Sequence, residues 1–310
     1  MTWCAGSGTD PGFPAGTVGG VTRRALFVGL ATLDLLYGVR ALPRHNEKVV
    51  AERQTIAAGG PAANAAVTHA ALGGASTLLT RLGTHPLADL IRADLGAHGV
   101  EVVDLGAAHS GPPPVSSIIS AGAHRAVVSV NGAAFGSGDD VGPGDPGALL
   151  TDCAVVLADG HHPDLALPIV AAARERGIPV LLDAGSWKPA AEPLLDLAEV
   201  VVCSADFRMP GVTPGLPVLR ALIGRGAAWA GISAGEGPIH WASRTGAGEV
   251  PVPTVEVVDT LGAGDVLHGA LAYGLATGPR AEPAGLLAAA AAVASDSCRC
   301  FGTRDWIRRT

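Results

Sequence analysis

The sequence of 310 residues predicts an α/β fold in which a doubly wound, mostly parallel sheet is flanked by helices and carries a small antiparallel β lid. The first observation is the apolar segment ALFVGL at 25–30, because a strand buried on both faces needs no polar alternation. The second is the alternation of similar segments with helical patterns along most of the chain. The third is a pair of early segments that break this alternation with strand-like patterns.

After the first strand, helices and strands follow one another in order. Helices are predicted at 61–74, 85–99, 165–177 and 217–226, and strands at 76–82, 154–158, 179–183, 199–204 and 227–233. In the second helix, the residues expected on one apolar face are Leu87, Leu90, Ile91 and Leu95. The apolar segment at 286–294 indicates a buried helix. Strands joined by helices of this length form right-handed βαβ units.

Two segments without helical periodicity are predicted to form the lid. Residues 47–58 and 114–132 have strand patterns, and the second indicates a hairpin about Gly122. Together with flanking residues, at about 36–58 and 113–132, they are expected to cover the carboxyl ends of the parallel strands, where such sheets bind ligands. Pairing of lids between subunits would make the protein a homodimer.

Two further expectations concern the extent of the domain. Residues 1–22 are expected to be a flexible N-terminal extension, because they hold many Gly, Pro and Thr residues and few large apolar side chains. Residues 23–310 are expected to form one α/β domain, because no linker long enough to separate two full domains interrupts them.

Charge and composition argue against several functions. The formal net charge of -7 disfavours a sequence-independent hold on nucleic acid, which requires a basic face. The longest apolar segment falls well short of the roughly 20 residues of a membrane span. The five cysteines lack a paired spacing, which favours a reducing, cytoplasmic setting. Cys298 and Cys300 form a C-x-C that indicates thiols near a helix end rather than a metal site.

The segment DTLGAGDVLHGA at 259–270 carries the chemistry. Gly262, Ala263 and Gly264 have little or no side chain, so their amides can approach an anion at the positive end of the following helix. Asp265 beside such an anion hole can accept a proton from an attacking hydroxyl, which predicts phosphoryl transfer. The alternative is a glycine-rich helix entry capped by an aspartate, and this motif alone leaves both open.

A second group of residues is expected at the same edge of the sheet. In AGGPAANAA at 58–66, Gly60 precedes a helix and Asn64 lies in its first turn, while GLATLD at 29–34 is expected to end the first strand with Asp34. Asp34 and Asn64 offer the acceptors and donors that sugar hydroxyls need. Each could alternatively be a turn residue or a cap.

With these motifs the chain resembles the ribokinase-like (PfkB-type) carbohydrate kinases from about residue 24 to its C-terminus. GGPAANAAV and DTLGAGDVLHGAL carry the resemblance, and several segments look most like ketohexokinase and sulfofructose kinase members. The resemblance implies an ATP- and Mg²⁺-dependent sugar kinase, with a ketohexose or sulfosugar favoured as substrate. It implies Asp265 as catalytic base, 262–264 as the anion hole, and sugar contacts from four residues: Asp34, Gly60, Asn64 and Asp159. Ser233, Gly235 and Gly237 match the turn that lines the nucleotide.

One departure from the family pattern concerns magnesium. The family's N-x-x-E element should follow the strand at 199–204, but the chain has CSADFRMPG there. Ser204 takes the place of the asparagine and is a candidate contact for the nucleotide, and no glutamate follows at the expected spacing. The metal ligands are therefore unassigned, and Mg²⁺ is expected to arrive on the ATP phosphates. A monovalent-cation requirement is left open.

Several alternatives accompany this interpretation. Residues 231–235 fit G-x-S-x-G, but the following segment looks like another strand, which disfavours a serine-hydrolase elbow. His161 and His162 are expected in a loop before a helix rather than at a metal. Arg125, in the lid hairpin, is a candidate contact for an anionic group on the substrate or a solvent-facing turn residue. A nucleoside kinase of the same fold and a catalytically silent sugar or nucleotide sensor remain as alternative functions.

Overall fold

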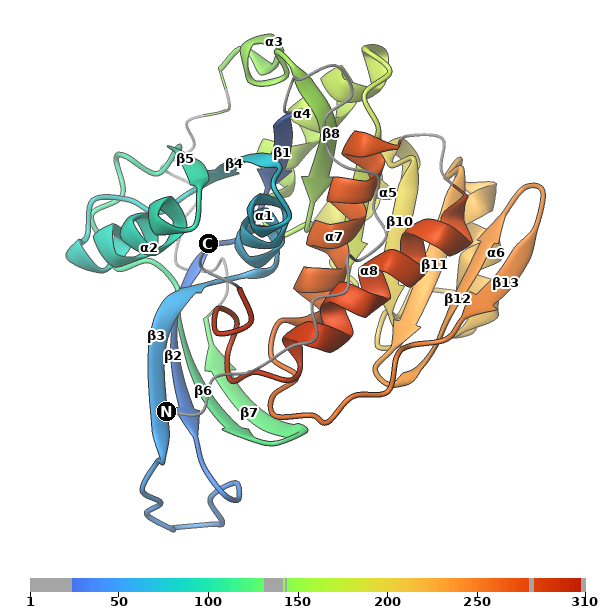
Figure 1. Ribbon diagram of the computed structural model, residues 1–310. Coiled ribbons are helices and arrows are strands. Elements are labelled where there is room, and N and C mark those ends of the chain that lie inside the picture. The colour runs from blue at the N-terminus through green and yellow to red at the C-terminus, as the bar shows by residue number, and fades with distance from the viewer. Residues whose placement is uncertain (1–23, 131–141, 143, 279–281, 308–310) are drawn as a thin grey trace.

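The computed structural model describes residues 24–130, 142, 144–278 and 282–307, so the extension predicted at 1–22 lies outside the described residues. Among them, one nine-stranded sheet has the order β13-β12-β11-β10-β9-β8-β1-β4-β5 (Figure 1). Its strands are β1 (Arg24–Val28), β4 (Ala75–Thr80), β5 (Val100–Asp104), β8 (Cys153–Ala158), β9 (Val180–Ala184), β10 (Val200–Ser204), β11 (Trp229–Ala234), β12 (Gly237–Ser243) and β13 (Ala247–Val250). All neighbours from β5 to β11 pair in parallel, and β12 and β13 are antiparallel.

Helices cover both faces of this sheet (Figure 1). One face packs against α1 (Pro61–Ala71), α2 (Pro86–Ala97), α7 (Ala263–Thr277) and α8 (Pro283–Ser297). The other packs against α4 (Pro163–Glu175), α5 (Glu192–Leu197) and α6 (Leu216–Gly224), and the short helices α3 (Pro146–Leu149) and η2 (Pro189–Ala191) complete the set. Within β1, Phe27 belongs to the first core and Leu26 to the second, as expected for a strand without polar alternation. The predicted α/β fold class is confirmed.

Most predicted helices and strands are confirmed with small shifts at their ends, and two details differ. β5 and β13 were not predicted, because each is short and partly exposed. Leu90 does not join the apolar face of α2, since it is 50% exposed while Ile91 and Leu95 are buried. The helix turns by about 100° per residue, so Leu90 cannot share the centre of a face with its neighbour.

The lid is a four-stranded sheet with the order β3-β2-β6-β7, formed by β2 (Thr32–Gly38), β3 (Arg53–Gly59), β6 (Val115–Ala121) and β7 (His124–Ser129). The prediction of an antiparallel lid is wrong at one pairing, because β2 and β6 run parallel. β2 follows β1 and β6 follows β5, so both lid strands begin at the carboxyl edge of the main sheet. β3 and β7 pair antiparallel with β2 and β6 and run in the opposite direction. The hairpin about Gly122 is confirmed, with φ of 63° at that glycine.

The limits of the first lid segment also change. The lid begins at Thr32, ahead of the predicted start near 36, and residues 47–52 are not part of a strand. Asp34 therefore lies in the lid strand β2 rather than at the end of β1.

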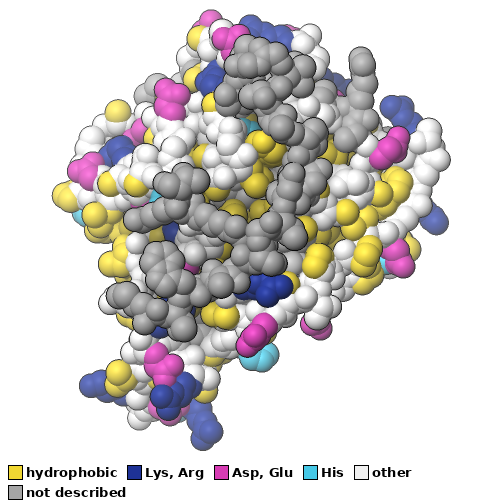
Figure 2. Space-filling view, viewed as in Figure 1, with side chains coloured by type: hydrophobic (Ala, Val, Ile, Leu, Met, Phe, Trp, Pro, Cys, Tyr) yellow, Lys and Arg dark blue, Asp and Glu magenta, His cyan; other side chains and the backbone are white. Residues whose placement is uncertain are grey.

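The exposed surface carries mixed charges. On the face that Figure 2 displays, the described Lys and Arg side chains are dispersed among acidic and apolar ones. In the part of the chain that the structure describes, every helix is too short or too polar to cross a membrane.

Candidate active site

The first turn of α7 contains the motif predicted to carry the chemistry. Gly262 precedes the helix with φ of 73°, a left-handed conformation, and a Cβ there would lie 2.8 Å from Thr303 Cγ2. Among the described residues, no side chain caps this helix, so Asp265 is not the helix cap that the motif left as an alternative. Gly264 is exposed. The Ala263 amide donates to the Thr260 carbonyl over 3.3 Å, whereas the amide of the exposed Gly264 can meet an anion from solvent.

The two predicted motifs meet through their side chains. Nδ2 of Asn64, in α1, donates to Oδ2 of Asp265 over 2.7 Å. Gly60 makes the turn that brings Asn64 there, with φ of 95° and its Cα so close to the Leu30 carbonyl that a Cβ would lie 2.4 Å from the oxygen. Residues 201 positions apart in the chain therefore form one site.

The environment of Asp265 favours its protonated form. Burial, followed by the charge of Asp183, raises the pKa of the Asp265 carboxyl to about 7. The hydrogen bond from Asn64 and the charge of His268 act in the opposite direction. A carboxyl group with this pKa exchanges protons near neutral pH, which suits a general base.

Asp34 lies in the same neighbourhood from the lid side. Its carboxylate accepts a 2.6 Å hydrogen bond from Thr32 Oγ1, and burial raises its pKa. Gly59, on the adjacent strand β3, leaves room for it, because a Cβ at Gly59 would lie 2.0 Å from a carboxylate oxygen of Asp34. The charge of Asp34 contributes to the raised pKa of Asp265, so the two carboxyl groups belong to one site.

Asp159 lies at the end of β8 and is 2% exposed. Its carboxylate accepts backbone hydrogen bonds from Leu30 over 2.9 Å, Ala62 over 3.1 Å and His161 over 2.9 Å. These bonds fix the end of β1 and the start of α1 relative to each other. Asp159 therefore organises the segments around the predicted sugar-binding positions.

Arg125 brings the lid to the motif at the start of α7. Its guanidinium, in β7, donates to Thr260 Oγ1 over 3.2 Å and is exposed. The contact places a positive charge next to the turn predicted to bind an anion.

The residues predicted to line the nucleotide lie at one sheet edge. Ser204 and Ser233 are paired directly in the register of β10 and β11. Ser204 Oγ donates to the Gly185 carbonyl over 2.8 Å, and Ser233 Oγ donates to the Cys203 carbonyl over 3.4 Å. Gly235, with φ of 58°, turns the chain from β11 into β12, which begins at Gly237. A strand, a turn and a second strand exclude the serine-hydrolase elbow.

Asp183, at the end of β9, and His268, in α7, were not predicted as site residues. His268 Nδ1 lies 2.8 Å from the Gly264 carbonyl, and its Nε2 lies 3.2 Å from the Val202 carbonyl. Asp183 closes a predicted strand, so the strand-end rule that singled out Asp34 would also have found it.

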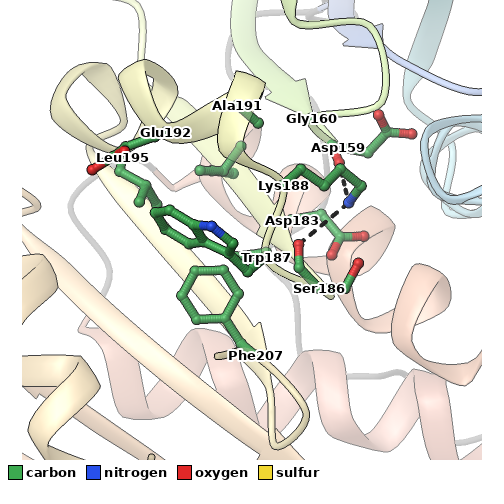
Figure 3. Close-up of a pocket in the computed structure, with 12 residues that line it drawn as sticks. Asp159, Gly160, Asp183, Ser186, Trp187, Lys188, Ala191, Glu192, Leu195 and Phe207 are labelled. Atoms are coloured by element: carbon green, nitrogen blue, oxygen red, sulfur yellow. Dashed lines mark hydrogen bonds between the residues drawn. The ribbon is translucent and has the colours of Figure 1, made fainter. Parts of the chain in front are cut away.

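A pocket opens beside Asp183 at the ends of β8 and β9 (Figure 3). Side chains that line it include Asp159, Asp183, Ser186, Trp187, Lys188 and Phe207. The Trp187 and Phe207 rings meet edge to face at 5.8 Å and form its apolar wall. Lys188 Nζ is 3.4 Å from the Asp159 carbonyl oxygen and 3.5 Å from that of Ser186.

A resident metal site is not evident in the described part of the chain, which contains no group of three or more His, Cys, Asp or Glu side chains that could hold an ion. Mg²⁺ carried on phosphates needs only one or two protein carboxylates, because it keeps several waters. Asp183, whose charge raises the pKa of Asp265, is a carboxylate of this site that could face such an ion.

Comparisons with known proteins agree with this geometry. Residues 22–308 match the model of the pfkB family carbohydrate kinases. The ribokinase of Arabidopsis thaliana is 26% identical over 287 residues, which cover 86% of this chain and 74% of that protein. The deoxyribokinase of Salmonella typhi is 27% identical over 266 residues, which cover 79% and 83%. These relatives are not ketohexokinases, the group that several sequence segments favoured.

Solved structures share the fold over nearly the whole chain. A crystal structure from Agrobacterium tumefaciens has a TM-score of 0.79 at 26% identity and covers 91% of this chain and 93% of that one. The structure of Arabidopsis thaliana ribokinase complexed with ribose and ATP has a TM-score of 0.71 at 21% identity, with coverage of 91% and 94%.

Proposed function

Because this chain belongs to the pfkB family of carbohydrate kinases, we propose that it transfers the γ-phosphate of ATP to a hydroxyl group of a sugar. The observation that carries the proposal is the position of Asp265. Its carboxyl group lies in the first turn of the uncapped helix α7 and accepts a hydrogen bond from Asn64. A base and an anion-binding helix end within one turn of each other are what phosphoryl transfer to a hydroxyl requires.

In the proposed mechanism, each residue has one task. Asp265 accepts the proton of the attacking hydroxyl, and the amides of 262–264 bind the transferred phosphoryl group. Asp34, Gly60 and Asn64 orient the sugar beneath the lid. Ser204, Ser233, Gly235 and Gly237 border the nucleotide, and Mg²⁺ neutralises the ATP phosphates. Closure of the lid would exclude water from the site, which limits wasteful hydrolysis of ATP.

For the substrate, we propose a pentose as the first candidate. The relatives are a ribokinase and a deoxyribokinase, and one related structure was solved with ribose and ATP. The ketohexose or sulfosugar that the sequence motifs favoured is the second candidate. An anionic sugar would gain from the Arg125 guanidinium, which donates to Thr260 close to the turn at 262–264.

A coupled assay of ATP consumption tests the function. The acceptor panel contains ribose, deoxyribose, fructose, aldohexoses, sugar acids, sulfosugars and nucleosides. Turnover with a sugar is the expected result. Turnover only with nucleosides would assign the nucleoside-kinase alternative, and ligand binding without turnover would assign the sensor.

The role of Asp265 is tested with Asp265→Asn. The variant keeps the size of the side chain and can still pair with Asn64, but it cannot accept the proton. We expect kcat to fall by about 10²- to 10⁴-fold, the usual contribution of a general base, while the Kd for ATP changes little. Equal losses in kcat and in ATP affinity would contradict the assigned role.

We also propose that the lids of two subunits pair. The register of the lid aligns Ile56, Leu35, Ser117 and Val128 in one row across the four strands. Ile56 and Val128 are 54% and 75% exposed, whereas Leu36 and Ile118, on the opposite face, are buried against Phe301. An exposed apolar row on a sheet is typical of a protein interface.

A further inference from the structure

Arg304 lies behind Asn64 in the C-terminal segment that follows α8, and its side chain is 9% exposed. Its Nη1 donates to Oδ1 of Asn64 over 3.0 Å. Nδ2 of the same Asn64 amide donates to Asp265 over 2.7 Å. One side-chain amide therefore connects a buried guanidinium to the proposed catalytic base.

All five N–H groups of the Arg304 guanidinium have partners within the protein. Besides Asn64, Nη1 donates to the Thr303 carbonyl over 3.2 Å. Nη2 donates to the Ala58 carbonyl over 2.8 Å and lies 3.1 Å from Asp94 Oδ2, and Nε donates to the same Asp94 oxygen over 3.1 Å. Since no donor is left over, Arg304 is not placed to bind a substrate oxygen itself.

The contact with Arg304 decides which way the Asn64 amide faces. An asparagine amide can be turned so that either its oxygen or its nitrogen points at a neighbour. A guanidinium only donates, so it requires the Asn64 oxygen, and the nitrogen is then directed at Asp265. In the opposite orientation the amide oxygen would face a carboxylate, which repels it.

The same guanidinium is joined to the base of the lid. Asp94, in α2, accepts hydrogen bonds from Arg304 and from the Ala58 amide at 3.0 Å. Ala58 is in β3, immediately before the Gly59–Gly60 turn into α1. Asp94 and Arg304 both bind the backbone of Ala58 at the end of β3. The turn that follows Ala58 leads into α1, which carries Asn64.

We infer that Arg304 is a positioning residue for phosphoryl transfer, which it serves by holding the Asn64 amide so that its NH₂ group donates to Asp265. The inference rests on the proposed function of Asp265. Asp94 holds Arg304 in place. The C-terminal segment thereby acts on the active site through Asn64 and not through a contact of Arg304 with the sugar.

The test compares Arg304→Met with Arg304→Lys and with a neighbouring control. Arg304→Met is expected to lower kcat by about 10- to 100-fold, the scale of one hydrogen bond to a charged group, with the KM for ATP little changed. Arg304→Lys retains the positive charge but not the planar set of N–H donors of the guanidinium, so partial activity is expected. Asp305→Asn breaks the exposed pair between Arg53 and Asp305, at the adjacent position, and should leave kcat unchanged.

A pH profile separates positioning from a merely structural role. The groups around Asp265 are Asp34 from β2, Asp183 from β9, His268 from α7, Asn64 from α1 and Arg304 from the C-terminal segment. Loss of the ordered Asn64 bond removes a contact that lowers the pKa of Asp265, so the acidic limb of kcat should move to higher pH in Arg304→Met. Added guanidinium should restore part of the turnover of Arg304→Ala.

A double-mutant cycle with Asn64→Ala completes the test. Because Arg304 acts through Asn64, Arg304→Met should cost little further turnover once Asn64 is alanine. Additive losses, or an unshifted pH profile in a folded Arg304→Met protein, would overturn the inference. If the wild type shows no turnover with any acceptor, the proposed function fails, and a crystal structure of Arg304→Met still tests the inference through the Asn64 Nδ2 to Asp265 distance. A distance and amide orientation unchanged from the wild type would then count against it.

Discussion

The imidazole Nδ1 of His268 lies 3.5 Å from a carboxylate oxygen of Asp183, and the two side chains are 5% and 9% exposed. The same ring contacts the carbonyls of Gly264 in α7 and Val202 in β10. The ring thus joins the first turn of the catalytic helix to the ends of two sheet strands. Asp183 and His268 also have opposite effects on Asp265: the first raises its pKa and the second lowers it.

These opposite effects predict opposite shifts in the pH dependence of turnover. Asp183→Asn removes a like charge near Asp265, so the pKa of Asp265 should fall below about 7 and the acidic limb of kcat should move to lower pH. His268→Gln removes the group whose charge lowers the pKa of Asp265, so the acidic limb of kcat should move to higher pH. Profiles of kcat between pH 5 and pH 9 measure both. Shifts in the same direction would show that Asp265 is not the titrating base.

The raised pKa of Asp265 also predicts that the base destabilises the protein. Its folded-state pKa of about 7 is above that of an unfolded aspartate, about 4, so between these values the folded chain binds more protons than the unfolded chain. Stability that is present at acidic pH is therefore lost as the pH rises through 7. Asp265→Asn should raise the melting temperature relative to the wild type, by more at pH 8 than at pH 5.

Thermal unfolding at the two pH values measures this difference. The control is Glu175→Gln, at an exposed position in α4. It should change the melting temperature by a small amount that is the same at both pH values. A stabilisation of Asp265→Asn that is equal at pH 5 and pH 8 would show that the buried charge of Asp265 is not its source.

The sequence predicted the parts of the site that follow from strand order. Carboxyl ends of parallel strands share one edge, so Gly60, Asn64 and Asp265 could be placed together before their contacts were known. Asp34 was placed near the same edge although its strand was misassigned, because β2 begins only a few residues after β1 ends.

Other parts of the site depend on tertiary packing. Arg304 lies in a turn-rich segment without periodicity, and its role follows from contacts with α1, α2 and β3. The parallel pairing of β2 with β6 depends on where the chain leaves the main sheet, which local pattern does not encode. His268 was not predicted as a site residue because its contacts with Asp183 and Val202 join segments that are distant in sequence.

The apolar row on the lid predicts the oligomeric state. Val128→Lys places a charge in the exposed row of the proposed interface between lids, which should shift the protein from dimer to monomer in size-exclusion chromatography with light scattering. Leu216→Lys changes a leucine that is 54% exposed at the start of α6, away from the lid, and should leave the mass unchanged. A wild-type protein that is monomeric at every concentration would contradict lid pairing.

Contact between α1 and α7 depends on Gly269, one turn after Asp265. A Cβ at this position would lie 2.4 Å from the Ala65 carbonyl oxygen and 2.6 Å from Thr68 Cβ, and neither atom is at the end of a flexible side chain. Gly269→Ala must therefore push the helices apart, so we expect a loss of about 1–3 kcal/mol in unfolding free energy and a lower kcat as Asn64 withdraws from Asp265. Gly96→Ala is the matched control, because it lies in α2 with nothing within 4 Å of the added methyl and should gain up to about 1 kcal/mol from helix propensity. Denaturant unfolding and turnover measured on both variants test this, and a Gly269→Ala protein as stable and active as Gly96→Ala would show that the close approach of the two helices is not required.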